Sequence, residues 1–332
     1  MLENLPVINQ IKEAINKANR VLLISHQKPD GDALGVLSAM AGFLKSIKKD
    51  YAVFCLDEVP PEYQFIPLTN EFKNDVEIFT HLRSRDSVKQ EEKFDVVIVM
   101  DSGDLKYAGV ADFVGKNKGY TLINIDHHYT NDFFGDLNLV LADRSSVSEI
   151  IFELFKLWQV KIDKEISTAL LNGLIFDTGA LSNPATSKEA LKISASLLNS
   201  GARFGEIKSN LLNNKSLNLL KIWGVAFERI SYNEKYQMAF TVLTADDLAK
   251  AELNAESSLG LINFFNELAG VKSAMLLVEQ PDGFIKGSLR TTNDNVDVSA
   301  LAKAFGGGGH QKAAGFTIKG KLVYNKDKWQ IE

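Results

Sequence analysis

The sequence predicts an α/β protein whose N-terminal part is an open, mainly parallel sheet. Short, continuously apolar runs rich in valine, isoleucine and leucine read as strands buried on both faces, which is typical of parallel sheets. These runs alternate with helical patterns, as parallel α/β domains require. The expected strands are VLLIS (21–25), YAVFCL (51–56), DVVIVM (95–100) and TLINI (121–125).

Helical patterns lie before and between these strands. The first twenty residues space isoleucines at helical intervals between charges, which predicts an amphipathic helix and not a secretory signal. Further helices are expected over 33–49 and 146–159. At the start of the latter, Ser146 and Glu149 have the spacing of a capping box.

The second half of the chain predicts a smaller α/β domain. From about 185 to 225 the pattern is helical without strands, and later segments such as YQMAFTVL, SAMLLVEQ, FIKGSLRTT and AAGFTIKG read as strands. A length of 332 residues fits about two domains. We therefore expect a domain over 1–185, a helical linker over 186–224 and a domain over 225–332, with the active-site cleft between the two domains.

Composition narrows the class of protein. No apolar run approaches the ~18 residues of a membrane span, so a membrane protein is not expected. Cys55 is the only cysteine, which excludes an intrachain disulfide and fits a reducing cytoplasm. The net charge of −5 counts against a protein that grips long duplex nucleic acid and suits a small anionic substrate.

Histidine and aspartate follow three of the four predicted strands, at the edge of the sheet where such domains place their sites. Any one of these residues alone would more often be a turn or a helix cap. Together they predict a metal centre, because imidazoles and carboxylates without thiolates favour Mn²⁺ or Mg²⁺. The set is His26, Asp30, Asp32, Asp101, Asp126, His127 and His128, with Asp177 in a later helical segment.

The number of carboxylates predicts two metal ions. Four converging carboxylates would repel one another and raise their pKa values. Two divalent ions cancel four negative charges and, about 3.5–4 Å apart, can stabilise both the attacking and the leaving oxygen of a phosphate. The four are Asp30, Asp32, Asp101 and Asp177.

A family resemblance rests on these residues and on two later motifs. Four segments resemble the metal-binding motifs of the DHH phosphoesterases: HQKPDGD (26–32), DSGD (101–104), DHH (126–128) and FDTG (176–179). Two more, GSLRT (287–291) and GGGGHQKAAG (306–315), resemble the DHH-associated C-terminal domain. The resemblance spans nearly the whole chain and is strongest to the branch of nanoRNases and pAp phosphatases (NrnA-like).

By position in these motifs, the resemblance implies a role for each residue. His26, Asp30 and Asp101 would hold a first metal ion, and Asp32, His127 and Asp177 a second, with Asp101 bridging. His128 would approach the substrate phosphate. Asp126 would orient the paired histidines, as partners of metal-bound histidine usually do.

The C-terminal motif predicts a site for an anion. The run Gly306, Gly307, Gly308 and Gly309 allows backbone N–H groups to approach a ligand closely. Arg290 can donate two hydrogen bonds to a phosphate, and His310 offers a further donor. A helix beginning at Gln311 would add its N-terminus to this site.

The resemblance implies a cytoplasmic hydrolase that cuts short oligoribonucleotides (nanoRNA) to mononucleotides and pAp to AMP, by a hydroxide that two metal ions activate. Mn²⁺ is the expected ion, with Mg²⁺ or Co²⁺ as alternatives. A phosphodiesterase for linear or cyclic signalling dinucleotides (pApA, pGpG, cyclic di-AMP) stays open. A RecJ-type exonuclease, a pyrophosphatase and a non-catalytic RNA-binding module fit the sequence less well. A homodimer is left open.

Overall fold

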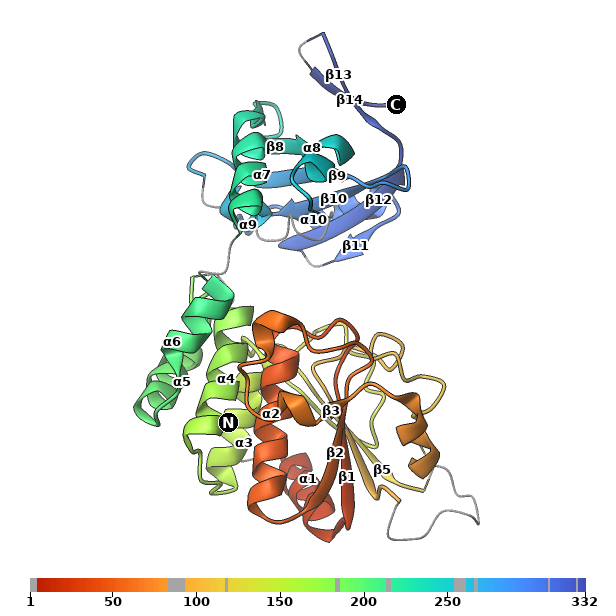
Figure 1. Cartoon of the computed structure of the whole chain (residues 1–332), viewed down its shortest axis with the longest axis vertical. Helices are drawn as coiled ribbons and strands as arrows, with labels where there is room; N and C mark the ends of the chain where they lie inside the picture. The colour runs from red at the N-terminus through yellow and green to blue at the C-terminus, as the bar shows by residue number, and fades with distance from the viewer. Residues whose placement is uncertain are drawn as a thin grey trace. The chain divides into compact units, whose positions relative to one another are not determined.

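A six-stranded parallel sheet organises the first of the two units into which the chain divides, Met1–Asn214 and Lys215–Glu332 (Figure 1). The computed structural model describes residues 5–82, 93–116, 119–182, 186–212, 216–253, 261–265, 268–309, 311–326 and 328–332. The sheet has the order β3-β2-β1-β4-β5-β6, and all its strand pairs are parallel. Its strands are β1 (Arg20–Ile24), β2 (Asp50–Phe54), β3 (Phe72–Lys73), β4 (Val96–Met100), β5 (Thr121–Asp126) and β6 (Leu137–Val140).

The four predicted strands of this sheet are confirmed as β1, β2, β4 and β5. The strand order reverses direction between β1 and β4, which are neighbours in the sheet although β2 and β3 separate them in the chain. In open α/β sheets such a switch point leaves a crevice beyond the carboxyl ends of the strands. The predicted residues His26 and Asp101 follow β1 and β4, so they start from neighbouring strands.

Helices cover one face of this sheet, and 3₁₀ turns and loops cover the other. The helical face carries α1 (Pro6–Lys17), α2 (Gly31–Ser46), α3 (Val147–Leu157), α4 (Lys164–Asp177) and α5 (Lys188–Asn199), followed by α6 (Phe204–Ile207) and a π-helical turn, η6 (Lys208–Leu212). The opposite face packs against η4 (Val76–Leu82), against residues 105–114 and against Tyr120. Two short 3₁₀ turns, η2 (Pro61–Tyr63) and η3 (Thr69–Glu71), follow β2. The sheet is thus buried on both faces, as its continuous apolar runs predict.

The helices α1 and α3 agree with the sequence predictions to different degrees. The N-terminal amphipathic helix is confirmed, because Ile8, Ile11 and Ile15 of α1 are buried. Ser146 caps α3 by accepting from the Glu149 N–H, but the reciprocal half of the predicted capping box is wrong. The buried Glu149 carboxylate instead accepts from the Ser145 N–H at 3.0 Å and from the Ser187 hydroxyl. These donors come from the start of α3 and from the cap of α5, so Glu149 ties two helices together.

The second unit is a smaller α/β structure around a mixed sheet of order β11-β12-β10-β9-β8-β7. Its strands are β7 (Ser231–Asn233), β8 (Met238–Leu243), β9 (Ser273–Glu279), β10 (Phe284–Arg290), β11 (Gly308–Gly309) and β12 (Ala313–Lys319). Only β8 and β9 pair in parallel. One core lies against α7 (Leu217–Glu228), α8 (Ala245–Lys250) and α9 (Leu261–Phe265), and another against α10 (Val298–Ala304). A hairpin, β13 (Leu322–Asn325) and β14 (Lys328–Ile331), ends the chain.

The described residues of the segment 186–224 form helices joined by short turns, and these helices divide between the units. The residues Ala190, Ile193 and Leu197 of α5 join the core of the first unit. The residues Ile222 and Ala226 of α7 join a core of the second. Within the described ranges, no helix has the length and apolar composition needed to cross a membrane.

Candidate metal centre

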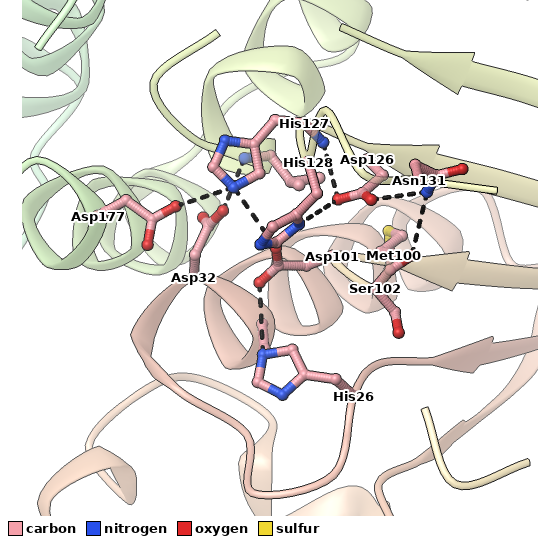
Figure 2. A network of polar contacts seen from close by, with 12 residues as sticks. His26, Asp32, Met100, Asp101, Ser102, Asp126, His127, His128, Asn131 and Asp177 are labelled. Carbon is pink, nitrogen blue, oxygen red and sulfur yellow. Dashed lines mark hydrogen bonds and ion pairs between the residues drawn. The ribbon is translucent and has the colours of Figure 1, made fainter. Parts of the chain in front are cut away.

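The predicted histidines and aspartates of the first unit meet at the switch point of the sheet (Figure 2). His26 follows β1, and Asp101 follows β4, the neighbouring strand. Asp126 is the last residue of β5, so His127 and His128 emerge at the same edge. Because parallel strands end at a common edge, residues about 75 and 100 positions apart in the chain converge here.

One group of possible metal ligands joins His26, Asp30 and Asp101. Their ligand atoms all lie within 4.8 Å of one another. His26 Nε2 is 3.7 Å from Asp30 Oδ2 and 3.7 Å from Asp101 Oδ2. His26 Nδ1 lies 2.7 Å from the carbonyl oxygen of Gln27, which fixes the ring so that Nε2 faces the carboxylates.

A second group joins Asp32, His127 and Asp177 within the same limit. His127 Nε2 lies 3.5 Å from Asp177 Oδ2 and 3.8 Å from Asp101 Oδ1. His127 Nδ1 is 3.2 Å from the carbonyl oxygen of Arg144. A backbone carbonyl oxygen thus orients this ring, as that of Gln27 orients the ring of His26. Asp101 therefore faces the histidine of each group with a different carboxylate oxygen.

His128 lies beside both groups and is held by Asp126. Asp101, His127 and His128 form a third cluster within ligand distance, so the geometry admits His128 as a ligand as well as a group that faces substrate. His128 Nδ1 is 2.8 Å from Asp126 Oδ1, which also accepts from the His127 N–H at 2.8 Å. Asn131 donates to the other Asp126 oxygen at 2.7 Å. Asp126 thus fixes the ring of His128 but only the backbone of His127.

Asp32 is held by contacts that the sequence does not reveal. Its carboxylate accepts from the N–H groups of Val147 at 2.6 Å and Ser148 at 3.1 Å, at the N-terminus of α3, and from the Ser148 hydroxyl. A helix N-terminus favours a negative charge. Gly173 of α4 leaves the room for this arrangement, because a Cβ there would lie 2.2 Å from both Asp32 Oδ1 and Ser148 Oγ. In the sequence, the signal for this contact is Gly173 itself, because a glycine inside a helical pattern often has a packing reason.

The centre concentrates negative charge in a buried place. Burial, together with the charges of Asp32 and Asp30, raises the pKa of Asp101 well above the usual range. Burial and the charges of Asp32 and Asp101 do the same to the pKa of Asp177. Burial alone would lower the pKa of His26, but its contacts with Asp30 and Asp101 raise it to about 9. Asp101 also has a left-handed backbone, with φ 58°, a costly conformation that clusters at functional sites.

The donor set fits divalent metal ions. The nitrogen–oxygen separations of 3.5–3.8 Å around His26 and His127 are too long for hydrogen bonds. Two metal–ligand bonds of about 2.1 Å span such gaps. The clustered groups are imidazoles and carboxylates, which suit hard or borderline divalent ions. Cations would also offset the repulsion among the buried carboxylates.

The predicted anion-binding residues belong to the second unit. Arg290 ends β10, and burial lowers the pKa of its guanidinium. The predicted helix at Gln311 is wrong: α10 ends at Ala304, and residue 311 lies between β11 and β12, which pair Gly308 with Gly315. Because β12 begins at Ala313, directly after Gln311 and Lys312, no helix begins at Gln311. His310 lies outside the described residues.

Two of the four glycines have no room for a side chain. A Cβ at Gly307 would lie 2.1 Å from the Gly315 carbonyl oxygen, and one at Gly309 would lie 2.6 Å from that of Ala313. Gly306 and Gly309 also have positive φ values, 75° and 136°. Around Gly308 a Cβ would meet nothing within 4 Å. Packing and backbone conformation therefore explain the glycines at 306, 307 and 309, and no ligand is needed for that. They do not explain Gly308.

The parallel sheet with clustered histidines and aspartates at its switch point defines an α/β protein with a centre for divalent metal ions. A model of the N-terminal domain of the DHH family matches residues 20–174, and a model of the DHHA1 domain matches residues 235–328. The chain belongs to the DHH family and is a hydrolase acting on phosphoester bonds. The resemblance read from the motifs is thereby confirmed.

Similar proteins cover nearly the full length of the chain. The bifunctional oligoribonuclease and PAP phosphatase NrnA of Thermus thermophilus is 28% identical over 319 residues, which cover 96% of this chain and 89% of that protein. Its namesake from Bacillus subtilis is 26% identical over 312 residues, covering 93% and 92%. An exopolyphosphatase-related protein from Bacteroides fragilis has a similar structure, with a TM-score of 0.83, 25% identity, and coverage of 93% and 90%.

Proposed function

We propose that this chain hydrolyses short oligoribonucleotides to mononucleotides and pAp to AMP, using two divalent metal ions. The observation that carries the proposal is the carboxylate of Asp101, which faces the two histidines of separate ligand groups with its two oxygens. Relatives that are named as oligoribonucleases and PAP phosphatases cover almost the whole chain and support the substrate class.

The proposed ligand sets follow the two groups. His26, Asp30 and Asp101 would hold one ion, and Asp32, His127 and Asp177 the other, with Asp101 placed to contribute to both. When bound, two such ions supply an activated water and neutralise charge on the phosphate. Mn²⁺ is the proposed ion because it accepts both imidazole and carboxylate ligands.

The chain's own side chains orient these ligands and contact the substrate. The carbonyl oxygens of Gln27 and Arg144 fix the rings of His26 and His127, so that each presents Nε2. We assign His128 to the substrate phosphate. Its Nδ1 is engaged by Asp126, which leaves Nε2 to exchange a proton or donate a hydrogen bond at a phosphate oxygen.

The second unit is proposed to select the substrate. Arg290, with Gly306, Gly307, Gly308, Gly309 and His310, is assigned to a phosphate or nucleotide. The proposed boundaries are 1–185 for the catalytic domain, 186–224 for the helical linker and 225–332 for the substrate-binding domain. The two matched family domains lie inside the outer ranges, which supports this division.

The experiment is a comparison of substrates with matched variants. Metal-free protein is titrated with Mn²⁺ by calorimetry, and turnover is measured on pAp, RNA dinucleotides, pApA, cyclic di-AMP and a long RNA. We expect two bound ions and a preference for pAp and the shortest RNAs. One bound ion would refute the bridging role of Asp101. A preference for cyclic di-AMP or the long RNA would keep the chemistry and overturn the proposed substrate.

A further inference from the structure

A cavity of about 440 Å³ in the first unit is lined on both sides of Asp177, by Phe176 and by Gly179, and plays no part in the roles assigned so far. It lies between the end of α4, the turn η2 and the π-helical turn η6, and its walls include Tyr63, Phe176, Ala180 and Leu211. Glu62 and Asn210 add a carboxylate and an amide. A cavity of this volume, lined by both polar and apolar groups, has room for a small molecule.

Phe176 connects this cavity to the metal centre. It directly precedes Asp177, and its ring lies over Gly31, the residue between Asp30 and Asp32. A Cβ at residue 31 would lie 2.7 Å from both Cβ and Cγ of Phe176, so the ring occupies the place of a side chain there. The aromatic wall of the cavity therefore touches the same two segments that supply three of the proposed ligands.

The residue Phe176 is exposed to solvent. It is 40% exposed, whereas its neighbour Ile175 on α4 is 4% exposed. Tyr63 supports it from the side in a T-shaped contact, with ring centroids 6.3 Å apart and an angle of 75°. This contact leaves part of the Phe176 side chain open to solvent, as its exposed fraction shows.

The backbone after Asp177 is bent sharply beside this cavity. Gly179, Ala180 and Leu181 are three consecutive left-handed residues, with φ of 55°, 60° and 66°. Hydrogen bonds hold the turn, from the Ala180 N–H to the Ile175 carbonyl at 2.8 Å and from the Leu181 N–H to the Thr178 hydroxyl at 3.0 Å. Left-handed backbone at non-glycine residues is uncommon and concentrates where function requires it.

We propose that this cavity is the subsite for a nucleobase of the substrate whose phosphate lies at the metal centre. The aromatic face of Phe176 stacks on the base, as aromatic side chains do when they bind single-stranded nucleic acid. The Asn210 amide donates to the Glu206 carbonyl at 2.9 Å and retains a carbonyl oxygen suited to a base edge. The Glu62 carboxylate accepts from an exocyclic amino group, which favours adenine, guanine or cytosine over uracil.

The proposal rests on the proposed function, and the test separates the two. Phe176→Tyr keeps an aromatic face, whereas Phe176→Leu keeps apolar packing over Gly31 and loses the face. Phe204→Ala is the matched control, because Phe204 is 39% exposed in the same unit and does not line the cavity. KM and kcat are measured on an adenine dinucleotide and on the same dinucleotide with one abasic position. Mn²⁺ affinity of each variant is measured by calorimetry without substrate.

We expect Phe176→Leu to raise KM for the adenine dinucleotide by about 5- to 150-fold, the cost of one lost base–aromatic stack, with Mn²⁺ affinity unchanged. Phe176→Tyr keeps an aromatic face and should raise KM less than Phe176→Leu. Phe204→Ala should behave like the parent chain, and the abasic substrate should not distinguish the variants. If the parent cleaves dinucleotides and Phe176→Leu matches Phe204→Ala, the subsite is refuted. Equal losses on the abasic substrate, or weaker Mn²⁺ binding, would show a packing role and also overturn it. A parent without activity on any dinucleotide would refute the proposed function instead.

Discussion

A methyl group added at Gly173 should disturb the metal centre from outside it. The new Cβ would lie 2.2 Å from Asp32 Oδ1, 2.2 Å from Ser148 Oγ and 3.0 Å from the Asp32 Cα atom. Overpacking of this kind typically costs about 1–3 kcal/mol. Replacing glycine by alanine within a helix returns up to about 1 kcal/mol. We therefore expect Gly173→Ala to lower the free energy of unfolding by up to about 3 kcal/mol.

The same change should weaken metal binding, because the Asp32 carboxylate must move away from the donors at the start of α3. Loss of a group that orients a metal ligand typically costs 10- to 100-fold in affinity. The assay is urea-induced unfolding in EDTA, followed by calorimetric titration of Mn²⁺ into the folded protein. Gly42→Ala in α2 is the matched control, since its Cβ would lie 3.2 Å from the Ile166 Cγ1 atom and no polar group is near. Equal stability and equal Mn²⁺ affinity in the two variants would refute the reasoning.

Four further outcomes follow from the same geometry. Asp101→Asn should remain folded by circular dichroism and lose nearly all turnover; retained activity would contradict the bridging role. His127→Ala should lose turnover and bind one Mn²⁺ ion fewer in calorimetry. Arg290→Ala should raise KM for pAp with little change in kcat, and an unchanged KM would remove this residue from the phosphate site. Burial raises the pKa of the Cys55 thiol to about 12, so a thiol reagent at pH 8 should label it only after unfolding; fast labelling of the folded chain would show that the segment directly after β2 is open to solvent.

The parts of the fold that the sequence predicts are those with strong local patterns. The strands β1, β2, β4 and β5 are continuous apolar runs and were predictable because burial on both faces leaves no polar alternation. The strand β3 is two residues long and β6 carries an asparagine within LNLV, so neither has enough apolar residues to stand out. Strand β11 consists of two glycines, whose pairing with β12 is set by the hairpin and not by side chains.

The residues of the candidate site also separate into those that the sequence predicts and those that it does not. His26, Asp101 and His127 could be predicted because they directly follow predicted strands, and parallel strands end at one edge. The donors to Asp32 could not, because Val147 and Ser148 lie 115 and 116 residues away and only the packing of α2, α3 and α4 brings them together. The exposed ring of Phe176 was equally hidden, since an apolar residue in a helical pattern is normally predicted to be buried.

The most direct test of the account is the Mn²⁺ dependence of pAp and RNA dinucleotide hydrolysis by protein first stripped with EDTA. The account predicts no turnover in EDTA, recovery as two equivalents of Mn²⁺ bind, and no recovery in Asp101→Asn. Turnover that survives EDTA, or full recovery with one bound ion, would contradict the proposed two-metal centre.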